Sequence, residues 1–567
     1  MKAKIIVAIM ATTFIAAAFA GCIGGEEAVE TGDVDAAAWT SVRKAPAGDH
    51  VLVPNDPFAI VAAVPFAMGG DAKLSILFSE LSKPGVLSTP IPLGPDANGV
   101  ATEAALACWE SSTGAVMVST YEEALVAAPF ATLLDVPMLI EGGDVESTLF
   151  ALGVTEVLCI GSASEIAGIA CAKISLPEVN TLIADLAYDK GKVIDYIALT
   201  AADDIEADYP GVAGLSAMAA VLAGFHGGIV IASDEFSLES KASYTSEGMD
   251  LGTAAGENFI KPAIRSSVAM LENKGHVPLY LALVGCPTTV APIFESGYAI
   301  DSFYGDLDDD PDVIELAVGR YVTIDLNDGL DLFARTAHYQ KFVETHVSSS
   351  QLSDVYGEWR DVAGFIYGHG LLETAWPNTL VQTELMMRQD GGFSTMTMAG
   401  AHPDAPGVDQ AIWEASNMVY LLVHGSPSGY SCTEGALGPT GKDIREWNLG
   451  PGLVYASTCL TTRLAGEKLA ESFSLNFLHA GGVCYVGANE VSADGIVIIP
   501  GVVDATGCDR LGEIFLRHVV IGNKPVGLAF RDAKNEFLTI SDDYHTWNEY
   551  VLYGDPALNT YEPVNGF

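Results

Sequence analysis

Two segments decide the fold: MVYLLVHG at residues 418–425 and LVYASTC at residues 453–459. In each segment an apolar, β-prone run ends in a reactive side chain, His424 in the first and Cys459 in the second. Continuous apolar runs of this length predict strands buried on both faces, as in parallel sheets. Sites in open parallel sheets form beyond the C-terminal ends of the strands. If the two strands are neighbours, we expect imidazole and thiol to lie side by side.

His424 and Cys459 together have the chemistry of a thiol nucleophile and its base. A cysteine beside a histidine reacts as a thiolate, because the imidazole takes the thiol proton. Gly425 lets the chain bend close to a substrate carbonyl, and the backbone N–H groups of Gly425 and Cys459 are candidate oxyanion donors. The following residues predict a helix over 464–478, whose N-terminus would further stabilise a thiolate.

Each residue alone also has an ordinary structural explanation. A single histidine after a strand is more often a hydrogen-bonded loop residue, and a single cysteine is more often a small buried apolar side chain. The joint pattern, a strand ending in His-Gly and then a strand ending in Cys 35 residues later, favours catalysis.

Upstream, short apolar runs alternate with Ala-rich stretches, a pattern that predicts an α/β fold of largely parallel sheets flanked by helices. We expect an N-terminal α/β domain over 49–258, accessory to the chemistry, and a catalytic domain over 259–567, with the polar stretch 233–258 as the boundary loop. The predicted strands are 115–119, 136–140, 156–160, 196–200, 228–232, 278–284 and 362–367; the predicted helices are 122–134, 214–222 and 259–273, with a short helical turn at 149–153.

The N-terminus reads as an export signal. Lys2 and Lys4 precede an apolar stretch that is too short for a comfortable membrane span, so residues 1–21 are expected to be a signal peptide. Small residues directly before Cys22 resemble the lipobox of prokaryotic lipoproteins, which implies lipidation of Cys22; an ordinary signal peptide with a chance cysteine is the alternative. The acidic residues 22–48 suit a flexible tether. We expect the chain to be anchored on the outer face of the cell membrane, or otherwise secreted.

The composition argues against nucleic acid as a partner and does not decide whether the cysteines form disulfides. The chain has 73 acidic and 27 basic residues, a net charge of −46, and such a surface repels nucleic acid. Its nine cysteines form no CxxC pair and no zinc-finger spacing. Buried free thiols explain most of them, and one or two disulfides would fit an oxidising location.

Six segments in order over residues 276–562 resemble the catalytic domain of the gingipain-type cysteine peptidases, family C25, which have a caspase-like fold. The resembling segments are Leu281 to Gly285, Asp306 through Arg320, His424-Gly425, Cys459, the stretch Leu469 to Ala488, and Tyr553 to Leu558. The resemblance implies an endopeptidase that cleaves protein or peptide substrates through a thioester on Cys459, with His424 as acid and base and no cofactor in the chemistry.

A carboxylate orients the histidine in some of these peptidases, and the resemblance makes Glu373 the candidate here. Asp361 and His369 are the competing positions. The chain departs from the family pattern at Glu490, which either turns the specificity pocket toward basic side chains or is simply solvated. Cys432, close to the His424 loop, either pairs with another cysteine or is inert.

Alternating carboxylates at Asp306, Asp308, Asp310 and Asp312 would present several oxygens to one hard cation. Members of the resembling family bind calcium, so a structural calcium ion is one expectation. Pro311 stands where an EF-hand loop needs glycine. The alternative expectation is an exposed acidic turn that binds no ion.

Residues 121–161 also resemble part of a prokaryotic cell-wall-binding repeat, which implies attachment to the cell envelope; an unrelated α/β module would show the same pattern. Two functions therefore compete. The first is an extracellular cysteine endopeptidase. The second is a catalytically inactive surface binding or scaffold protein built on a peptidase fold. The first requires His424 and Cys459 to lie close together at an accessible edge.

Overall fold

The computed structural model describes residues 34–559, except 71–72, 79–80, 82–85, 207–212, 240–242, 246–247, 251–257, 296–297, 309–312, 350–358, 369–376, 400–406, 433–437, 493–495, 500–501 and 506. Of the sequence predictions, Glu373, His369, Asp310, Asp312, the signal peptide and Cys22 lie outside these residues, as do residues 22–33 of the predicted tether.

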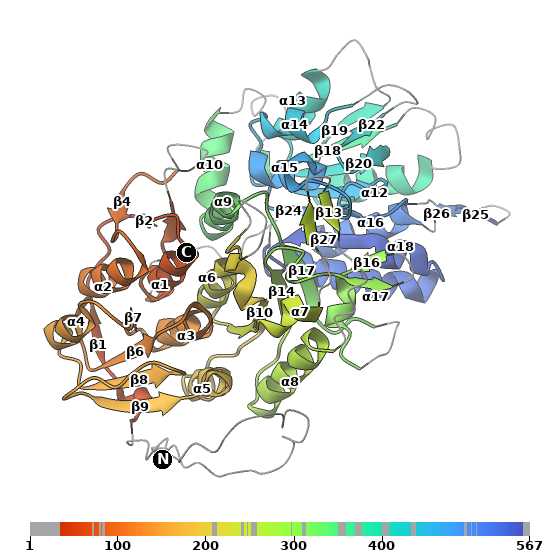
Figure 1. Ribbon diagram of the computed structural model, residues 1–567. Coiled ribbons are helices and arrows are strands. Elements are labelled where there is room, and N and C mark those ends of the chain that lie inside the picture. Colours follow the sequence, from red (N-terminus) through yellow and green to blue (C-terminus); the bar gives the residue numbers. More distant parts are fainter. Residues whose placement is uncertain are drawn as a thin grey trace.

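A ten-stranded sheet forms the centre of the protein, in the order β11-β10-β14-β17-β27-β24-β23-β20-β18-β19. Figure 1 shows β10, β14 and β17 in yellow to green, and β18, β20, β24 and β27 in teal to blue. The strands are Ile229–Ala232 (β11), Tyr196–Thr200 (β10), Tyr280–Val284 (β14), Ala317–Tyr321 (β17), Tyr550–Gly554 (β27), Cys484–Ala488 (β24), Leu453–Ser457 (β23), Met418–Leu422 (β20), Val362–Tyr367 (β18) and Ser394–Ala399 (β19).

The sheet consists of two parallel halves that run in opposite directions. All neighbouring strands pair in parallel except β24 and β27, which are antiparallel. The strands from β11 to β27 therefore end at one edge of the sheet, and those from β24 to β19 end at the opposite edge. The predicted α/β class with largely parallel sheets is confirmed, but the reversal between the halves was not foreseen.

Helices cover both faces of the second half because its strands are apolar on both sides. Every residue of β20, β23 and β24 is buried. On one face the Tyr455 hydroxyl donates to the Cys508 carbonyl at the start of α16 (Cys508–Val520). On the other, the ring of Tyr485 contacts the rings of Phe473 and Phe477 in α15 (Phe473–Ala480). Burial on two faces explains why these strands lack polar alternation.

The N-terminal part forms two smaller parallel sheets, β3-β2-β4 and β7-β6-β8-β9, packed on α1 (Pro57–Met68) and α3 (Tyr121–Leu134). A capping box of Thr120 and Glu123 starts α3. The helical turn predicted at 149–153 is the C-terminal part of a longer helix, α4 (Val145–Leu152). The strands of these sheets are Ser75–Leu77 (β3), His50–Leu52 (β2), Pro90–Pro92 (β4), Met138–Ile140 (β7), Gly114–Val118 (β6), Glu156–Ile160 (β8) and Ala170–Ile174 (β9).

The central sheet continues across the predicted domain boundary. Both β10 and β11 precede residue 258, yet β10 pairs with β14 along its length. A domain boundary at 258/259 would therefore cut this sheet. In chain order, the first strand of the central sheet is β10, which begins at Tyr196. The stretch 233–258 also contains short elements: α7 (Glu235–Glu239), β12 (Ser243–Thr245) and β13 (Gly248–Asp250).

A disulfide joins Cys159 in β8 to Cys171 in β9. Replacing both cysteines with serine is expected to destabilise the N-terminal part by about 2–4 kcal/mol, since the bridge restricts the unfolded chain. Urea unfolding of the double variant, against wild type with and without reductant, measures this. Equal midpoints for oxidised wild type and the variant would contradict the expectation.

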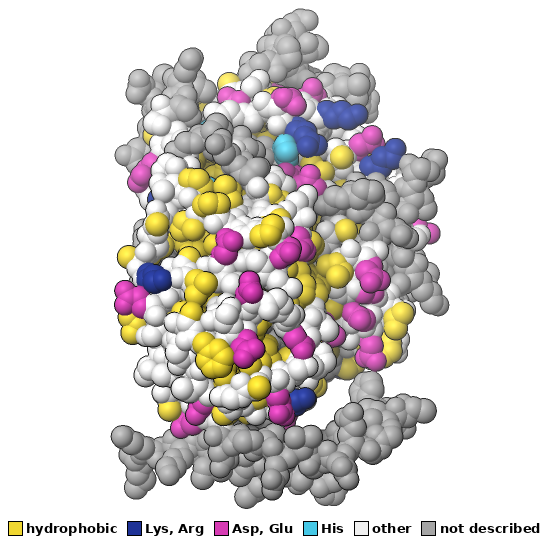
Figure 2. Space-filling view, turned by 60° about the vertical axis from the view of Figure 1, so that its left-hand side comes forward, with side chains coloured by type: hydrophobic (Ala, Val, Ile, Leu, Met, Phe, Trp, Pro, Cys, Tyr) yellow, Lys and Arg dark blue, Asp and Glu magenta, His cyan; other side chains and the backbone are white. Residues whose placement is uncertain are grey.

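On the face that Figure 2 shows, acidic side chains are spread out rather than gathered in one patch. On the face in Figure 2, magenta carboxylates lie scattered between white and yellow atoms, and dark-blue basic side chains are few. This agrees with the charge of −46. No helix in the described part of the chain has the length and apolar character needed to cross a membrane.

Candidate active site

The register of β20 and β23 places His424 beside Cys459. Leu422, the last residue of β20, pairs with Ser457, the last residue of β23. His424 and Cys459 each follow two residues later, so they leave adjacent strands at the same edge and at matching positions. His424 is exposed, and Cys459 is half-buried and is not part of a disulfide. The structure thus brings together the two residues that the sequence predicted.

Gly425 packs directly against the backbone of Cys459. A Cβ added at Gly425 would lie 2.1 Å from the Cys459 carbonyl oxygen and 2.9 Å from Oγ1 of Thr458. No side chain larger than hydrogen fits this contact. Gly425 belongs to the short hairpin of β21 (His424–Ser426) and β22 (Gly429–Ser431), so the contact fixes this hairpin against the nucleophile loop.

The predicted helix over 464–478 is wrong in its first half, because α15 begins only at Phe473. Tertiary hydrogen bonds replace the helical ones in the preceding loop. The Thr462 N–H donates to the Ala488 carbonyl, and the Gly466 N–H donates to Met249 in β13. No helix N-terminus follows Cys459 directly, and stabilisation of a thiolate by such a dipole is withdrawn.

Leu460, next to the nucleophile, has a left-handed backbone with φ of 63°. This region is costly for residues other than glycine, by roughly 1–2 kcal/mol. The surroundings hold it there: the Leu460 N–H donates to the Glu490 carbonyl, and its own carbonyl accepts from the Arg463 N–H. Strain of this kind gathers at functional turns, and here it makes the chain reverse immediately after Cys459.

A buried carboxylate connects the two strands that lead into His424 and Cys459. Asp509, in the first turn of α16, is 2% exposed. Its Oδ1 accepts hydrogen bonds from the Tyr420 hydroxyl at 3.0 Å and the Ser457 hydroxyl at 2.7 Å. Because Tyr420 lies in β20 and Ser457 in β23, Asp509 connects them just behind His424 and Cys459. The sequence analysis missed this residue, which no local motif marks.

A third catalytic residue is not found among the described residues. No described side chain forms a hydrogen bond with the His424 imidazole, and Glu373 and His369 lie outside the described ranges. Asp361 immediately precedes β18, so it lies at the start of that strand. Because β18 and β20 are parallel, this is the edge opposite His424, and Asp361 cannot orient the imidazole.

Glu490 follows β24 and is half-buried. Its carboxylate lies 3.4 Å from Nη1 of Arg463, so a basic side chain of this protein already partners it. Both residues line a recess of about 20 Å³, together with Asp301 and Arg320. This volume can hold one water molecule but no lysine or arginine side chain. Cys432 is buried, and burial raises the pKa of its thiol to about 12, which makes it unreactive.

Arg320, from the Ala-Val-Gly-Arg segment, is a buried structural residue. Its guanidinium binds Asp301 through two hydrogen bonds of 2.9 and 2.6 Å and donates to the Val290 carbonyl. Lys534 in α17 (Val526–Ile540) lies nearby, with Nζ 3.1 Å from Oγ of Ser302. Burial lowers the pKa of Lys534 to about 7.

The pKa of Lys534 predicts a pH-dependent stability. An unfolded lysine has a pKa of about 10.4, so between about pH 7 and 10.4 the unfolded chain binds more protons and stability rises with pH. Lys534→Met is expected to raise stability at pH 7 and to remove a slope of about 1.4 kcal/mol per pH unit across that window. Urea unfolding at pH 7 and 9 measures this, with Lys524→Met, a surface lysine paired with Asp532, as control. An unchanged slope in Lys534→Met would refute it.

Two of the four predicted carboxylates, Asp306 and Asp308, lie in a cluster with Glu315, and Asp310 and Asp312 lie outside the described residues. Asp306, Asp308 and Glu315 present carboxylate oxygens within 4.8 Å of one another. Glu315 had not been singled out. Burial and the charges of Asp308 and Asp306 raise the pKa of Glu315. Such hard oxygen donors fit Ca²⁺. Lys261 already contacts Asp306, with Nζ 3.4 Å from Oδ2.

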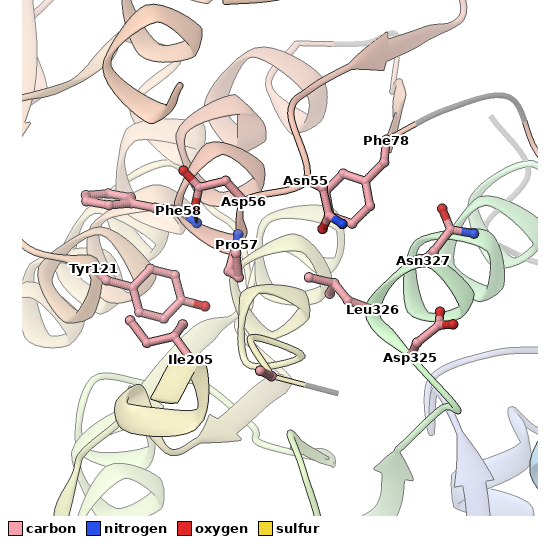
Figure 3. Close-up of a pocket in the computed structure, with 11 residues that line it drawn as sticks. Asn55, Asp56, Pro57, Phe58, Phe78, Tyr121, Ile205, Asp325, Leu326 and Asn327 are labelled. Carbon is pink, nitrogen blue, oxygen red and sulfur yellow. Dashed lines mark hydrogen bonds between the residues drawn. The ribbon is translucent and has the colours of Figure 1, made fainter. Parts of the chain in front are cut away.

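A cavity of about 650 Å³ lies away from the His424–Cys459 pair. Figure 3 shows its lining: Phe58 and Tyr121 on one side, and Leu326 and Asn327 at the start of α9 (Leu326–Ala337) on the other. The chain enters α9 from the end of β17, at the edge opposite the one where β20 and β23 end. The cavity is therefore not part of the Cys459 site.

Known proteins resemble this chain in sequence and in fold. The sequence model described as peptidase family C25 matches residues 233–561, more than half of the chain. Similar solved structures include the Arg-specific cysteine proteinase gingipain R (12% identity, 64% of this chain and 77% of that chain, TM-score 0.44). A complex of RgpB pro- and mature domains from Porphyromonas gingivalis (12%, 64% and 79%, 0.45) and a structure described as a protease (14%, 66% and 81%, 0.44) are also similar. No curated protein matches significantly.

Proposed function

Because the chain belongs to peptidase family C25 and is a cysteine peptidase, we propose that it is an exported endopeptidase whose nucleophile is Cys459 and whose base is His424. The matching register of β20 and β23 is the observation that carries this proposal. It brings an exposed imidazole and a half-buried thiol to one edge of the sheet. The contact of Gly425 with the Cys459 carbonyl supports the same assignment.

The proposed reaction is acyl transfer to sulfur followed by hydrolysis. His424 takes the proton of Cys459, and the thiolate attacks the carbonyl carbon of the scissile peptide bond. The backbone N–H groups of Gly425 and Cys459 stabilise the oxyanion. His424 then gives its proton to the leaving amine as the C–N bond breaks. Water, deprotonated by His424, attacks the thioester, and the product acid leaves as the thiol is restored.

The proposed location is the outer face of the cell membrane, with lipid on Cys22. The charged start, apolar stretch and small residues before Cys22 support export and lipidation. The disulfide between Cys159 and Cys171 supports an oxidising compartment. Metabolic labelling with a fatty acid, in wild type and Cys22→Ser, tests it; equal labelling of both would refute lipidation.

A calcium ion at Asp306, Asp308 and Glu315 is proposed as structural only. Adding about 1 mM Ca²⁺ is expected to raise the unfolding temperature of wild type but not of Asp308→Asn. The same shift in both proteins would place the ion elsewhere.

Labelling with a peptidyl thiol-reactive probe near neutral pH tests the catalytic pair. Wild type is expected to label far faster than free cysteine, His424→Ala slowly, and Cys459→Ala not at all. If wild type labels no faster than free cysteine, the protein is not an active thiol peptidase. If Cys459→Ala still labels rapidly, another thiol is the nucleophile.

A further inference from the structure

The segment Asn489–Ser492, which follows β24, contacts the nucleophile turn on the side away from His424. In the sheet β23 lies between β20 and β24, so Cys459 has the His424 hairpin on one side and this segment on the other. The Cys459 thiol lies 3.4 Å from the Ser492 carbonyl oxygen. The Leu460 N–H donates to the Glu490 carbonyl. The segment thus contacts both the reactive sulfur and the strained residue after it.

His545 holds the middle of this segment. In α18 (Tyr544–Glu549), Nε2 of His545 lies 2.7 Å from the Val491 carbonyl oxygen. Nδ1 of the same ring is hydrogen-bonded to the hydroxyl of Tyr298 in β16 (Tyr298–Ile300). Oε2 of Glu549, in the same helix, also lies 3.2 Å from Nε2. In the tautomer whose Nε2–H donates to Val491, Nδ1 accepts from Tyr298. One imidazole therefore connects two elements distant in sequence to the segment beside Cys459.

Hydrogen bonds also hold both ends of the segment. The position of Val491 in its middle therefore depends on His545. The Asn489 N–H donates to the Glu549 carbonyl, and Asn489 Nδ2 donates to the Ala299 carbonyl at 2.6 Å. The Ser492 hydroxyl lies 3.3 Å from the Tyr550 hydroxyl. By contrast, the Val491 side chain is 59% exposed, so its packing adds little.

We propose that His545 is a positioning residue for Cys459, acting through the Val491 carbonyl. This rests on the proposed function, in which Cys459 is the nucleophile. The Asn489–Ser492 segment limits the sulfur to orientations from which it can reach His424 and a substrate carbonyl. Without the hydrogen bond from His545, the segment shifts, the Ser492 carbonyl moves from the sulfur, and the nucleophile loses alignment. Small misplacements of reacting atoms are costly, about 10²-fold per ångström.

Alkylation of Cys459 by iodoacetamide tests this without requiring a substrate. His545→Leu removes the donor, whereas His545→Gln keeps an N–H that can reach the Val491 carbonyl. We expect His545→Leu to slow alkylation and lower kcat, each by about 10- to 100-fold, with His545→Gln within a few-fold of wild type. Tyr298→Phe should give an intermediate loss. His518→Gln, which removes the contact of a histidine in α16 with Glu536 in α17, is the matched control and should react like wild type.

The outcomes separate this inference from the proposed function. Wild-type rates of Cys459 alkylation and turnover in His545→Leu would overturn the positioning role. So would equal defects in His545→Leu and His545→Gln, since a hydrogen bond from the side chain would then be irrelevant. If His545→Leu unfolds at a lower temperature than wild type, the test rests on Tyr298→Phe. A wild-type rate of Cys459 alkylation in Tyr298→Phe would then count against the proposal. If wild-type Cys459 reacts no faster than free cysteine, the proposed function itself fails before any variant is compared.

Discussion

Replacing Cys459 with alanine is expected to lower peptide cleavage by at least about 10⁴-fold while the protein stays folded. The thiolate forms the covalent bond to the substrate, and no other described side chain occupies that position. Cys459 is half-buried at the end of β23, so removing one sulfur atom leaves a small gap and little loss of stability. Cleavage of a fluorogenic peptide mixture, with thermal unfolding in parallel, measures both effects.

The matched controls are another cysteine and the partner histidine. Cys432→Ala removes a buried thiol beyond β22 and should keep near-wild-type kcat. His424→Ala should lose nearly as much activity as Cys459→Ala, and the double variant no more than the worse single one, because the two residues act as a unit. Additive losses, or turnover by Cys459→Ala within tenfold of wild type, would refute the dyad.

Exchanging Gly425 for alanine is expected to lower kcat by about 10²-fold or more and to destabilise the protein by about 1–3 kcal/mol. The new methyl group would stand 2.1 Å from the Cys459 carbonyl oxygen, so either the His424 hairpin or the nucleophile turn has to move. Either movement separates imidazole from thiol and displaces the proposed oxyanion donors. Steady-state kinetics and urea unfolding of the same preparation measure this.

Gly392→Ala is the control for glycine replacement in general. A Cβ at Gly392 meets no atom within 4 Å, but the backbone there has φ of +73°. It should therefore cost about 1 kcal/mol of stability and leave kcat unchanged. If Gly425→Ala also leaves kcat unchanged, the close approach of the hairpin to Cys459 has no catalytic role.

Local sequence was sufficient to predict strands that tertiary contacts do not change. The runs at 418–422 and 453–457 are strands because nearly every residue in them is apolar, and the structure buries every residue. The prediction from local sequence failed where tertiary hydrogen bonds replaced local ones. The stretch after Cys459 has helical composition at Leu464, Ala465 and Leu469, yet Gly466 has a φ of +80° and bonds to Met249, more than 200 residues away in sequence.

In the candidate site, too, some residues could be predicted from the sequence and others could not. The reactive residues could be chosen in advance, because chemistry depends on residue type and both stand directly after predicted strands. Asp509 and His545 could not, because each acts through partners that only the folded chain brings near. Glu315 was missed for a similar reason: it joins the acidic cluster from seven residues beyond Asp308. The role of Glu373 stays a prediction.

By itself, the sequence determined that His424 and Cys459 end two buried strands, because apolar periodicity and residue chemistry are local properties. Only the tertiary structure decided that those strands are neighbours in register, that β24 lies beyond them, and that the sheet reverses direction at β27. Strand order and direction are set by which faces can be buried together across the whole chain, and no local run of residues encodes that choice. The same packing brings Gly425 against Cys459 and the segment beside Cys459 against His545.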